Sequence, residues 1–178
     1  MYDQICKIIT ENGVRLIYTA NKAIAATLKK LEGEYPSLHS DISLNEKIAF
    51  ELALTGAYSS KRTACVFSTE GLYEALDPLM SSAYTGVIGG FLIVCIKETE
   101  EDITPLGLFS KLPIIVTESL DDLKRAIAFG YGISEKYEIP VIVQAAAETA
   151  AAQTEGRGRK DEEGSLKKIS SEPQVGTP

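Results

Sequence analysis

The sequence is poor in the residues that build metal and redox centres. It has three cysteines, Cys6, Cys65 and Cys95, which lie far apart, and a single histidine, His39. Disulfide frames, zinc sites and iron–sulfur clusters need such residues at short, repeated spacings. The sequence therefore predicts no metal site and no iron–sulfur cluster in this chain. We expect buried core thiols at Cys65 and Cys95 and a solvated or strand-edge imidazole at His39.

Basic patches and long apolar runs are also scarce. The net charge is −7, and adjacent basic residues occur only as isolated pairs. Nucleic acid is therefore not an expected partner. The longest apolar run, residues 87–96, is about half of what a membrane span needs, and the first residues lack the charged-then-apolar layout of a signal peptide. These absences give the expectation of a cytoplasmic protein that does not bind membranes.

The size and the pattern of apolar residues indicate the fold class. A chain of 178 residues with 44% hydrophobic residues supports one domain with a sizeable core. Short apolar runs alternate with helical stretches, which predicts a three-layer α/β fold with about six mainly parallel strands and helices on both faces. We expect strands at residues 14–18, 39–42, 63–67, 91–96, 114–117 and 140–143, and helices at residues 2–11, 21–31, 44–59, 69–82 (interrupted at 77–78) and 119–137.

The composition changes near the C-terminus. Residues 145–152 are rich in alanine, and residues 154–178 are polar with almost no apolar side chains. Such a segment buries too little surface to offset its ordering entropy. We therefore predict a folded unit at residues 1–144 and a disordered tail or linker at residues 145–178, in which the alanine run either adds a turn or two of helix or stays irregular.

In parallel α/β sheets, ligands collect at the carboxyl ends of the strands. The segments to consider are therefore those that follow strands: residues 19–21, 43–46, 68–71, 97–107 and 117–119. None of them has the glycine-rich fingerprint of a phosphate-binding loop. The glycines at residues 86–90 precede a strand and are better explained as a turn.

Glu46 is the most informative residue in these segments. It stands before a helical stretch, residues 48–58, that is almost wholly small or apolar and that we expect to lie deep in the fold. One interpretation is structural, because Ser43 and Glu46 have the spacing of a capping box. The other is a functional carboxyl in an apolar setting. On the residues alone the cap is favoured.

The motifs around Glu46 resemble those of one family. They are Asn45-Glu46-Lys47-Ile48-Ala49, Lys61-Arg62, Glu70-Gly71-Leu72, Asp77-Pro78-Leu79-Met80 and Ala83-Tyr84-Thr85-Gly86-Val87 with Gly89-Gly90. Together they are similar to the pyrimidine-binding (N-terminal) domain of 2-oxoacid:ferredoxin oxidoreductases, in particular the alpha subunit of indolepyruvate ferredoxin oxidoreductase. The resemblance is strong over residues 45–94 and looser over residues 112–143.

The resemblance implies the pyrimidine-type domain of the thiamine diphosphate-binding fold, with the cofactor at a domain interface. In that family the glutamate that matches Glu46 hydrogen-bonds a ring nitrogen of the aminopyrimidine. A carboxyl in a dry pocket is suited to this role, because its charged form is disfavoured and it can share a proton with the ring. The resemblance thus favours the site interpretation, with Glu46 as the catalytic residue. The predicted cofactor-binding residues are Asn21, Asn45, Thr69, Glu70 and Gly71.

The sequence departs from the family in two loops. Residues 18–23 replace a Tyr-Pro-Gly-Thr-Pro-Ser type loop, so that Asn21 stands where the family has a threonine. Residues 97–102 form a short acidic segment that would repel a carboxylate substrate. The two tyrosines Tyr73 and Tyr84 are expected to pack in the core, with a partner surface as the alternative.

The chain also lacks a Gly-Asp-Gly segment followed about thirty residues later by asparagine, the set that binds the diphosphate through a divalent cation. A partner domain or subunit would have to supply the diphosphate site and Mg²⁺. The chain is therefore expected to be inactive alone and to work in a homo- or hetero-oligomer. The alternatives are a non-catalytic assembly or regulatory relative, and the small subunit of a split 2-oxoacid decarboxylase.

Overall fold

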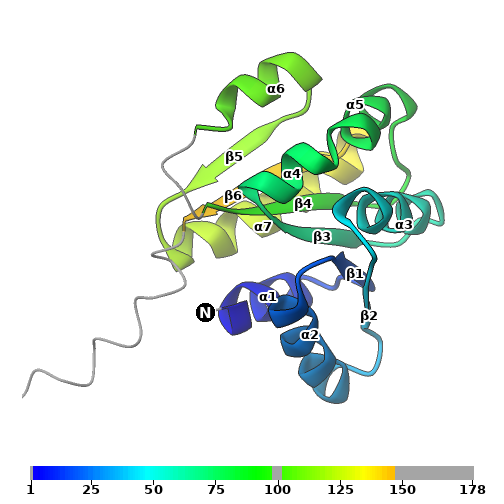
Figure 1. The fold of residues 1–178 in the computed structure, drawn as a ribbon, viewed down its shortest axis with the longest axis vertical. Helices are drawn as coiled ribbons and strands as arrows, with labels where there is room; N and C mark the ends of the chain where they lie inside the picture. Colours follow the sequence, from blue (N-terminus) through cyan, green and yellow to red (C-terminus); the bar gives the residue numbers. More distant parts are fainter. Residues whose placement is uncertain (1, 98–101, 147–178) are drawn as a thin grey trace, which may run out of the picture.

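In a computed structural model, residues 2–97 and 102–146 are described and form one six-stranded sheet. All strand pairs are parallel, and the order is β2-β1-β3-β4-β6-β5 (Figure 1). The predicted α/β class is confirmed. The strands are β1 (Leu16–Thr19), β2 (His39–Ile42), β3 (Thr63–Ser68), β4 (Phe91–Lys97), β5 (Ile114–Thr117) and β6 (Val141–Ala146).

Helices cover both faces of the sheet (Figure 1). One face packs against α1 (Tyr2–Glu11), α2 (Lys22–Glu34) and α7 (Leu120–Tyr137). The other packs against α3 (Glu46–Tyr58), α4 (Thr69–Glu74), α5 (Leu76–Thr85) and α6 (Thr104–Ser110). Successive residues of a central strand contact opposite layers, so residues 64–67 of β3 and 91–96 of β4 are all apolar, as in central parallel strands.

The three cysteines lie in this core, and all of them are fully buried. Burial raises the pKa of the Cys65 thiol well above its usual value. Burial, with a smaller contribution from the charge of Asp3, raises the pKa of Cys6 to about 12. Both thiols are therefore protonated at neutral pH, as inert core residues are. His39, at the start of β2, is exposed, as expected.

Two helical predictions need correction. The segment after β4 contains α6, which the sequence did not predict, because this helix has seven residues and includes Pro105 and Gly107. The fourth predicted helix is interrupted at Ala75 rather than at Asp77-Pro78. Pro78 is the third residue of α5, where a backbone N–H has no intrahelical partner, so proline is tolerated there.

The C-terminal strand continues to Ala146, where the described residues end. The predicted tail lies almost wholly outside the described residues, and the boundary at residue 144 stays a prediction. Among the helices of residues 2–97 and 102–146, none combines the length and the apolar character needed to cross a membrane.

The topology places a switch point at the carboxyl ends of β1 and β3. The chain leaves β1 through α2, on one face, towards the edge strand β2. It leaves β3 through α4 and α5, on the opposite face, towards β4. Neighbouring strands whose connections depart in opposite directions form the switch point at which α/β sheets bind ligands. Glu46 begins α3, which crosses over β1 from β2 to β3.

Candidate functional site

Glu46 is the first residue of α3, and Asn45 is its N-cap. The side-chain oxygen of Asn45 accepts a hydrogen bond of 2.9 Å from the backbone N–H of Ile48. Ser43 lies two residues before this cap, so the capping box predicted for Ser43 and Glu46 is wrong, and the helix begins two residues later than predicted. Asn45 has the capping role, which leaves the carboxyl of Glu46 available for another contact.

That carboxyl lies over Gly71 of α4. A Cβ atom built on Gly71 would lie 2.8 Å from Cγ and 3.1 Å from Oε1 of Glu46, closer than side chains tolerate. Ser68, the N-cap of α4, holds this turn by accepting a hydrogen bond of 3.1 Å from the Gly71 N–H. The absence of a side chain at Gly71 thus makes the recess that Glu46 occupies. Glu46 and Gly71 were both predicted as site residues from the sequence, and the structure brings them together.

Glu74 completes this arrangement, and the sequence reasoning missed it. It lies one helical turn after Gly71 and shares a hydrogen bond with the Glu46 carboxyl. Glu74 follows Gly71 by three residues, which puts both on one face of α4. This spacing could have identified Glu74 from the sequence. Partial burial raises the pKa of Glu46, its own backbone N–H acts in the opposite sense, and the Glu74 hydrogen bond and charge raise it further. The net direction is upward, so Glu46 holds a proton more readily than an ordinary glutamate.

The other predicted site residues have local structural contacts. Asn21 is the N-cap of α2, and its side-chain oxygen accepts from the N–H groups of Ala23 (2.9 Å) and Ile24 (3.2 Å). Because α2 covers the face opposite to α3 and α4, Asn21 lies at the other side of the sheet from Glu46. Thr69 is buried, and its hydroxyl lies 3.9 Å from the Cys95 thiol. Glu70 is exposed.

Two hydroxyls that the sequence reasoning did not select line the same edge. Thr19, at the end of β1, is buried and donates a hydrogen bond of 2.8 Å to the Val66 carbonyl of β3. The Ser43 N–H donates to the Thr19 carbonyl at 2.9 Å. The Ser43 hydroxyl is buried and has no hydrogen-bond partner among the described residues. A buried polar group of this kind needs a partner from outside the described chain.

An exposed apolar surface extends from Glu46 along α3 and α5, and we call it the Glu46 surface. Its side chains come from α3, α4, α5 and the residue before the α3 cap; they are Leu44, Ile48, Leu52, Tyr73 and Tyr84. Leu44 is 89% exposed and Tyr84 is 87% exposed. The prediction that α3 lies deep in the fold is therefore wrong for the side of the helix that carries Ile48 and Leu52. The prediction that Tyr73 and Tyr84 pack in the core is also wrong.

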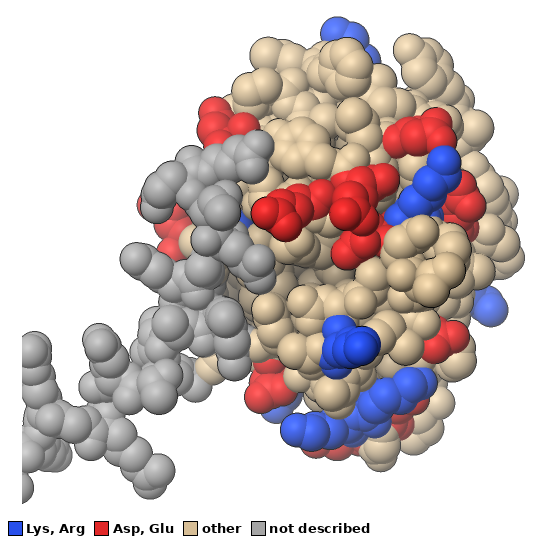
Figure 2. Space-filling view, in the orientation of Figure 1, with Lys and Arg blue, Asp and Glu red and all other residues tan. Residues whose placement is uncertain are grey.

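The helices under this surface are held together at both ends. Lys47 Nζ of α3 lies 2.5 Å from the carboxylate of Asp77 in α5, and the Tyr58 hydroxyl donates to Thr85 Oγ1 at 2.8 Å. Acidic side chains gather over α4 and the start of α3 (Figure 2), the elements that carry Glu46, Glu70 and Glu74. Over the described residues, no group of three or more His, Cys, Asp and Glu side chains is arranged to hold a metal ion.

Comparisons with known proteins identify relatives of the chain. No model of a protein family matches it. It is 31% identical over 137 residues to the indolepyruvate oxidoreductase subunit IorA of Archaeoglobus fulgidus, a match that covers 71% of this chain and 22% of that protein. The subunit of the same name from Pyrococcus horikoshii is 29% identical over 114 residues, covering 60% of this chain and 18% of that protein. The chain thus spans about a fifth of the length of these relatives.

A solved structure has the same fold. It is a 2-oxoglutarate:ferredoxin oxidoreductase from Magnetococcus marinus, with 2-oxoglutarate, coenzyme A and succinyl-CoA bound. The TM-score is 0.71 at 17% identity, and the match covers 84% of this chain and 29% of that one. The resemblance predicted from the sequence motifs is confirmed: this chain is a relative of one part of the indolepyruvate oxidoreductase subunit IorA and has the fold of a domain of 2-oxoacid oxidoreductases.

Proposed function

We propose that this chain is the pyrimidine-binding part of a thiamine diphosphate-dependent 2-oxoacid oxidoreductase of the indolepyruvate or pyruvate type. The principal observation is the Glu46 carboxyl, set in the recess left by Gly71 near the topological switch point of the sheet, with its pKa raised. The names of the relatives support the reaction class. When bound, thiamine diphosphate supplies the electron sink for 2-oxoacid decarboxylation.

The residues present fit the aminopyrimidine half of this cofactor. A carboxyl with a raised pKa holds a proton more readily than an ordinary glutamate and can donate it to a ring nitrogen, and partial exclusion of water favours the protonated form. Gly71 leaves the space that Glu46 needs, and the Ser43 hydroxyl is a buried group that lacks a partner among the described residues. Asn45 fixes the start of α3 and so aims Glu46. Thr69, Glu70 and Asn21 would shape the rest of the pocket.

A partner would supply the other half of the site. The chain has no diphosphate motif, and its three cysteines are buried core thiols, so we infer that the diphosphate, Mg²⁺ and any iron–sulfur cluster are bound elsewhere in the assembly. The Glu46 surface is where such a partner would dock. Large apolar side chains that are largely exposed around a polar recess are typical of a protein interface.

The experiment is calorimetry of the complex formed by this chain with the diphosphate-binding protein that copurifies with it. Thiamine diphosphate with Mg²⁺ is expected to bind the wild-type complex and to bind the Glu46→Gln variant at least about tenfold more weakly, because the amide cannot transfer its proton. Glu51→Gln, an exposed position on the same helix, is the matched control. Equal cofactor affinity of all three complexes would contradict the role of Glu46.

The first loop favours one alternative function, a non-catalytic assembly or regulatory relative that keeps the fold. The acceptor oxygen of Asn21 is occupied by the two N–H groups of α2, which leaves only its amide donor for a ligand. A wild-type complex that assembles but does not bind thiamine diphosphate would favour this alternative.

A further inference from the structure

The strand β5 forms an open edge of the sheet, far from Glu46 in the strand order. Among the described residues it pairs with β6 alone. The Ile142 N–H donates to the Pro113 carbonyl. Since successive backbone groups of a strand point to opposite sides, the N–H and C=O groups of Ile114 and Val116 point away from β6. Val116 is 52% exposed. None of its four residues is lysine or proline, two residue types that prevent edge pairing.

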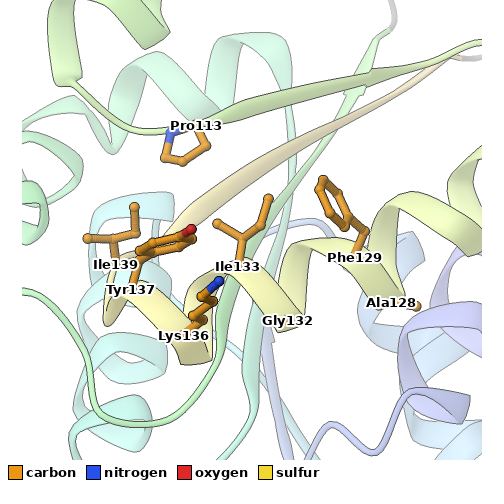
Figure 3. Close-up of a pocket in the computed structure, with 8 residues that line it drawn as sticks. All are labelled: Pro113, Ala128, Phe129, Gly132, Ile133, Lys136, Tyr137 and Ile139. Carbon is orange, nitrogen blue, oxygen red and sulfur yellow. The ribbon is translucent and has the colours of Figure 1, made fainter.

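Exposed apolar side chains flank this edge on both faces of the sheet. On one face, Phe129 and Tyr137 of α7 are exposed and line a groove of about 600 Å³ with Pro113 and Ile133 (Figure 3). On the other face, Leu108 and Phe109 of α6 are exposed. We call these residues, together with residues 114–117, the β5 surface. An apolar patch that continues across both faces of an open sheet edge is typical of an interface.

Charged side chains lie at both ends of the β5 surface. Beside the carboxyl-terminal half of β5, a second groove of about 270 Å³ is lined by Asp122 and Arg125 with Phe129. At the other end, Lys136 lines the larger groove beside Pro113 and Tyr137 (Figure 3). These residues of α7 lie three or four positions apart, so they form one stripe along the helix with Phe129 in the middle.

We propose that the β5 surface binds a second copy of this chain, with the two β5 strands antiparallel and a two-fold axis between them. An isologous interface requires a patch that is complementary to itself. Antiparallel pairing meets this requirement, since it brings Phe129 against its counterpart and Lys136 of one copy towards the Asp122–Arg125 ion pair of the other. This inference concerns the edge of the sheet and does not depend on the proposed cofactor site.

The direction of the free backbone groups fixes the register. When Ile114 of one copy lies opposite Val116 of the other, both outward N–H groups and both outward carbonyls of each copy are paired. Ile115 then lies on the two-fold axis, and the two sheets join into one continuous sheet. On one face of the joined sheet, α7 lies beside α7 of the other copy. On the opposite face, α6 lies beside α6 of the other copy. The exposed side chains of both helices are therefore covered.

The test is sedimentation equilibrium of the whole chain with edge variants. Val116→Pro removes an outward N–H that the monomer does not use in its ladder, and Val116→Thr is the matched control that keeps it. Phe129→Glu places like charges together at the axis and does not touch the backbone. We expect a wild-type dimer whose dissociation constant rises at least about tenfold in Val116→Pro and Phe129→Glu, and changes less than about threefold in Val116→Thr.

Hydrogen exchange supplies the second measurement. The Ile114 amide is expected to be protected in the wild-type dimer and to exchange freely in Phe129→Glu, with circular dichroism showing that the variant is folded. A wild-type chain that stays monomeric would overturn the proposal, as would a dimer that neither variant weakens. A monomer whose Ile114 amide is protected would also overturn it, because another segment of the same chain would then cover the edge.

Discussion

The Glu46 surface and the β5 surface are both apolar and exposed, but their polar groups differ. On the Glu46 surface an ionisable carboxyl sits in a recess that a glycine leaves open, next to a second carboxyl. On the β5 surface the charged side chains lie at the ends, and the polar groups that lack a partner within residues 2–97 and 102–146 are those of the backbone. The first arrangement suits a ligand with a proton-accepting ring under a partner. The second suits a strand of a second copy.

The strongest test of this comparison measures a variant of each surface both for its effect on the cofactor site and for its effect on self-association. Glu46→Gln is expected to lower turnover of the reconstituted assembly at least about 100-fold, the usual size of a lost acid–base group. It should leave the sedimentation of the chain unchanged. Val116→Pro should weaken self-association and leave cofactor affinity unchanged. If Glu46→Gln dissociated the dimer, or if its turnover were unaffected, the division of roles between the two surfaces would be wrong.

A smaller effect is expected when the recess under Glu46 is filled. Gly71→Ala brings a Cβ to 2.8 Å from Glu46 Cγ and displaces a flexible side chain rather than backbone. We expect turnover to fall about tenfold because the carboxyl is misplaced. The free energy of unfolding should change by less than about 1 kcal/mol, since alanine has the better helix propensity. Gly33→Ala in α2, where a Cβ meets nothing within 4 Å, is the control and should leave turnover unchanged.

The sheet was predictable from the sequence because its strands are buried on both faces. Uniformly apolar runs such as those of β3 and β4 predict buried strands directly. All six strands were expected close to their observed positions. The short helix α6 was not predictable, because its proline and glycine resemble a loop. The exposure of α3 was not predictable either. Apolar residues all around a helix indicate that it is covered, but not whether its own chain or a partner covers it.

The site was only partly predictable. Glu46 and Gly71 were selected because of a resemblance to a family, and their contact depends on how α3 packs against α4. Glu74 was missed for the same reason, because its hydrogen bond with Glu46 joins two helices that no local pattern relates. The cap at Asn45 shows the reverse case. The spacing of Ser43 and Glu46 predicted the cap at Ser43, whereas the backbone places it at Asn45, two residues later.

A moderate loss of partner binding is expected when an exposed side chain of the Glu46 surface is removed. Tyr84→Ser removes an aromatic ring that is 87% exposed in the chain. The variant should change the free energy of unfolding by less than about 0.5 kcal/mol. It should weaken binding of the diphosphate-binding partner about fivefold to tenfold, as loss of an aromatic interface contact does. Tyr137→Ser on the β5 surface is the control, and partner binding measured by surface plasmon resonance should distinguish the two. Equal losses in both variants would contradict separate interfaces.

The smallest expected effect is a gain in stability when the Glu46 charge is removed. Because the folded-state pKa of Glu46 is raised, the folded chain binds this proton more tightly than the unfolded chain does. Its stability therefore falls as pH rises from the unfolded pKa of about 4.3 through the folded pKa. Above that window, Glu46→Gln should be more stable by about 0.5 kcal/mol, a small value because the carboxyl is partly open to solvent. At pH 4 the two proteins should unfold at nearly the same urea concentration.

Glu74→Gln provides the partner variant for this measurement. It removes the second carboxyl of the pair, so it should reproduce part of the gain, and the double variant should gain less than the sum of the two. Urea unfolding between pH 4 and pH 7 measures both. Additive gains would mean that the carboxyls do not share a proton, and a destabilised Glu46→Gln would mean that its charge supports the fold. A stabilised but inactive variant is the result expected of a group kept for chemistry at a cost in stability.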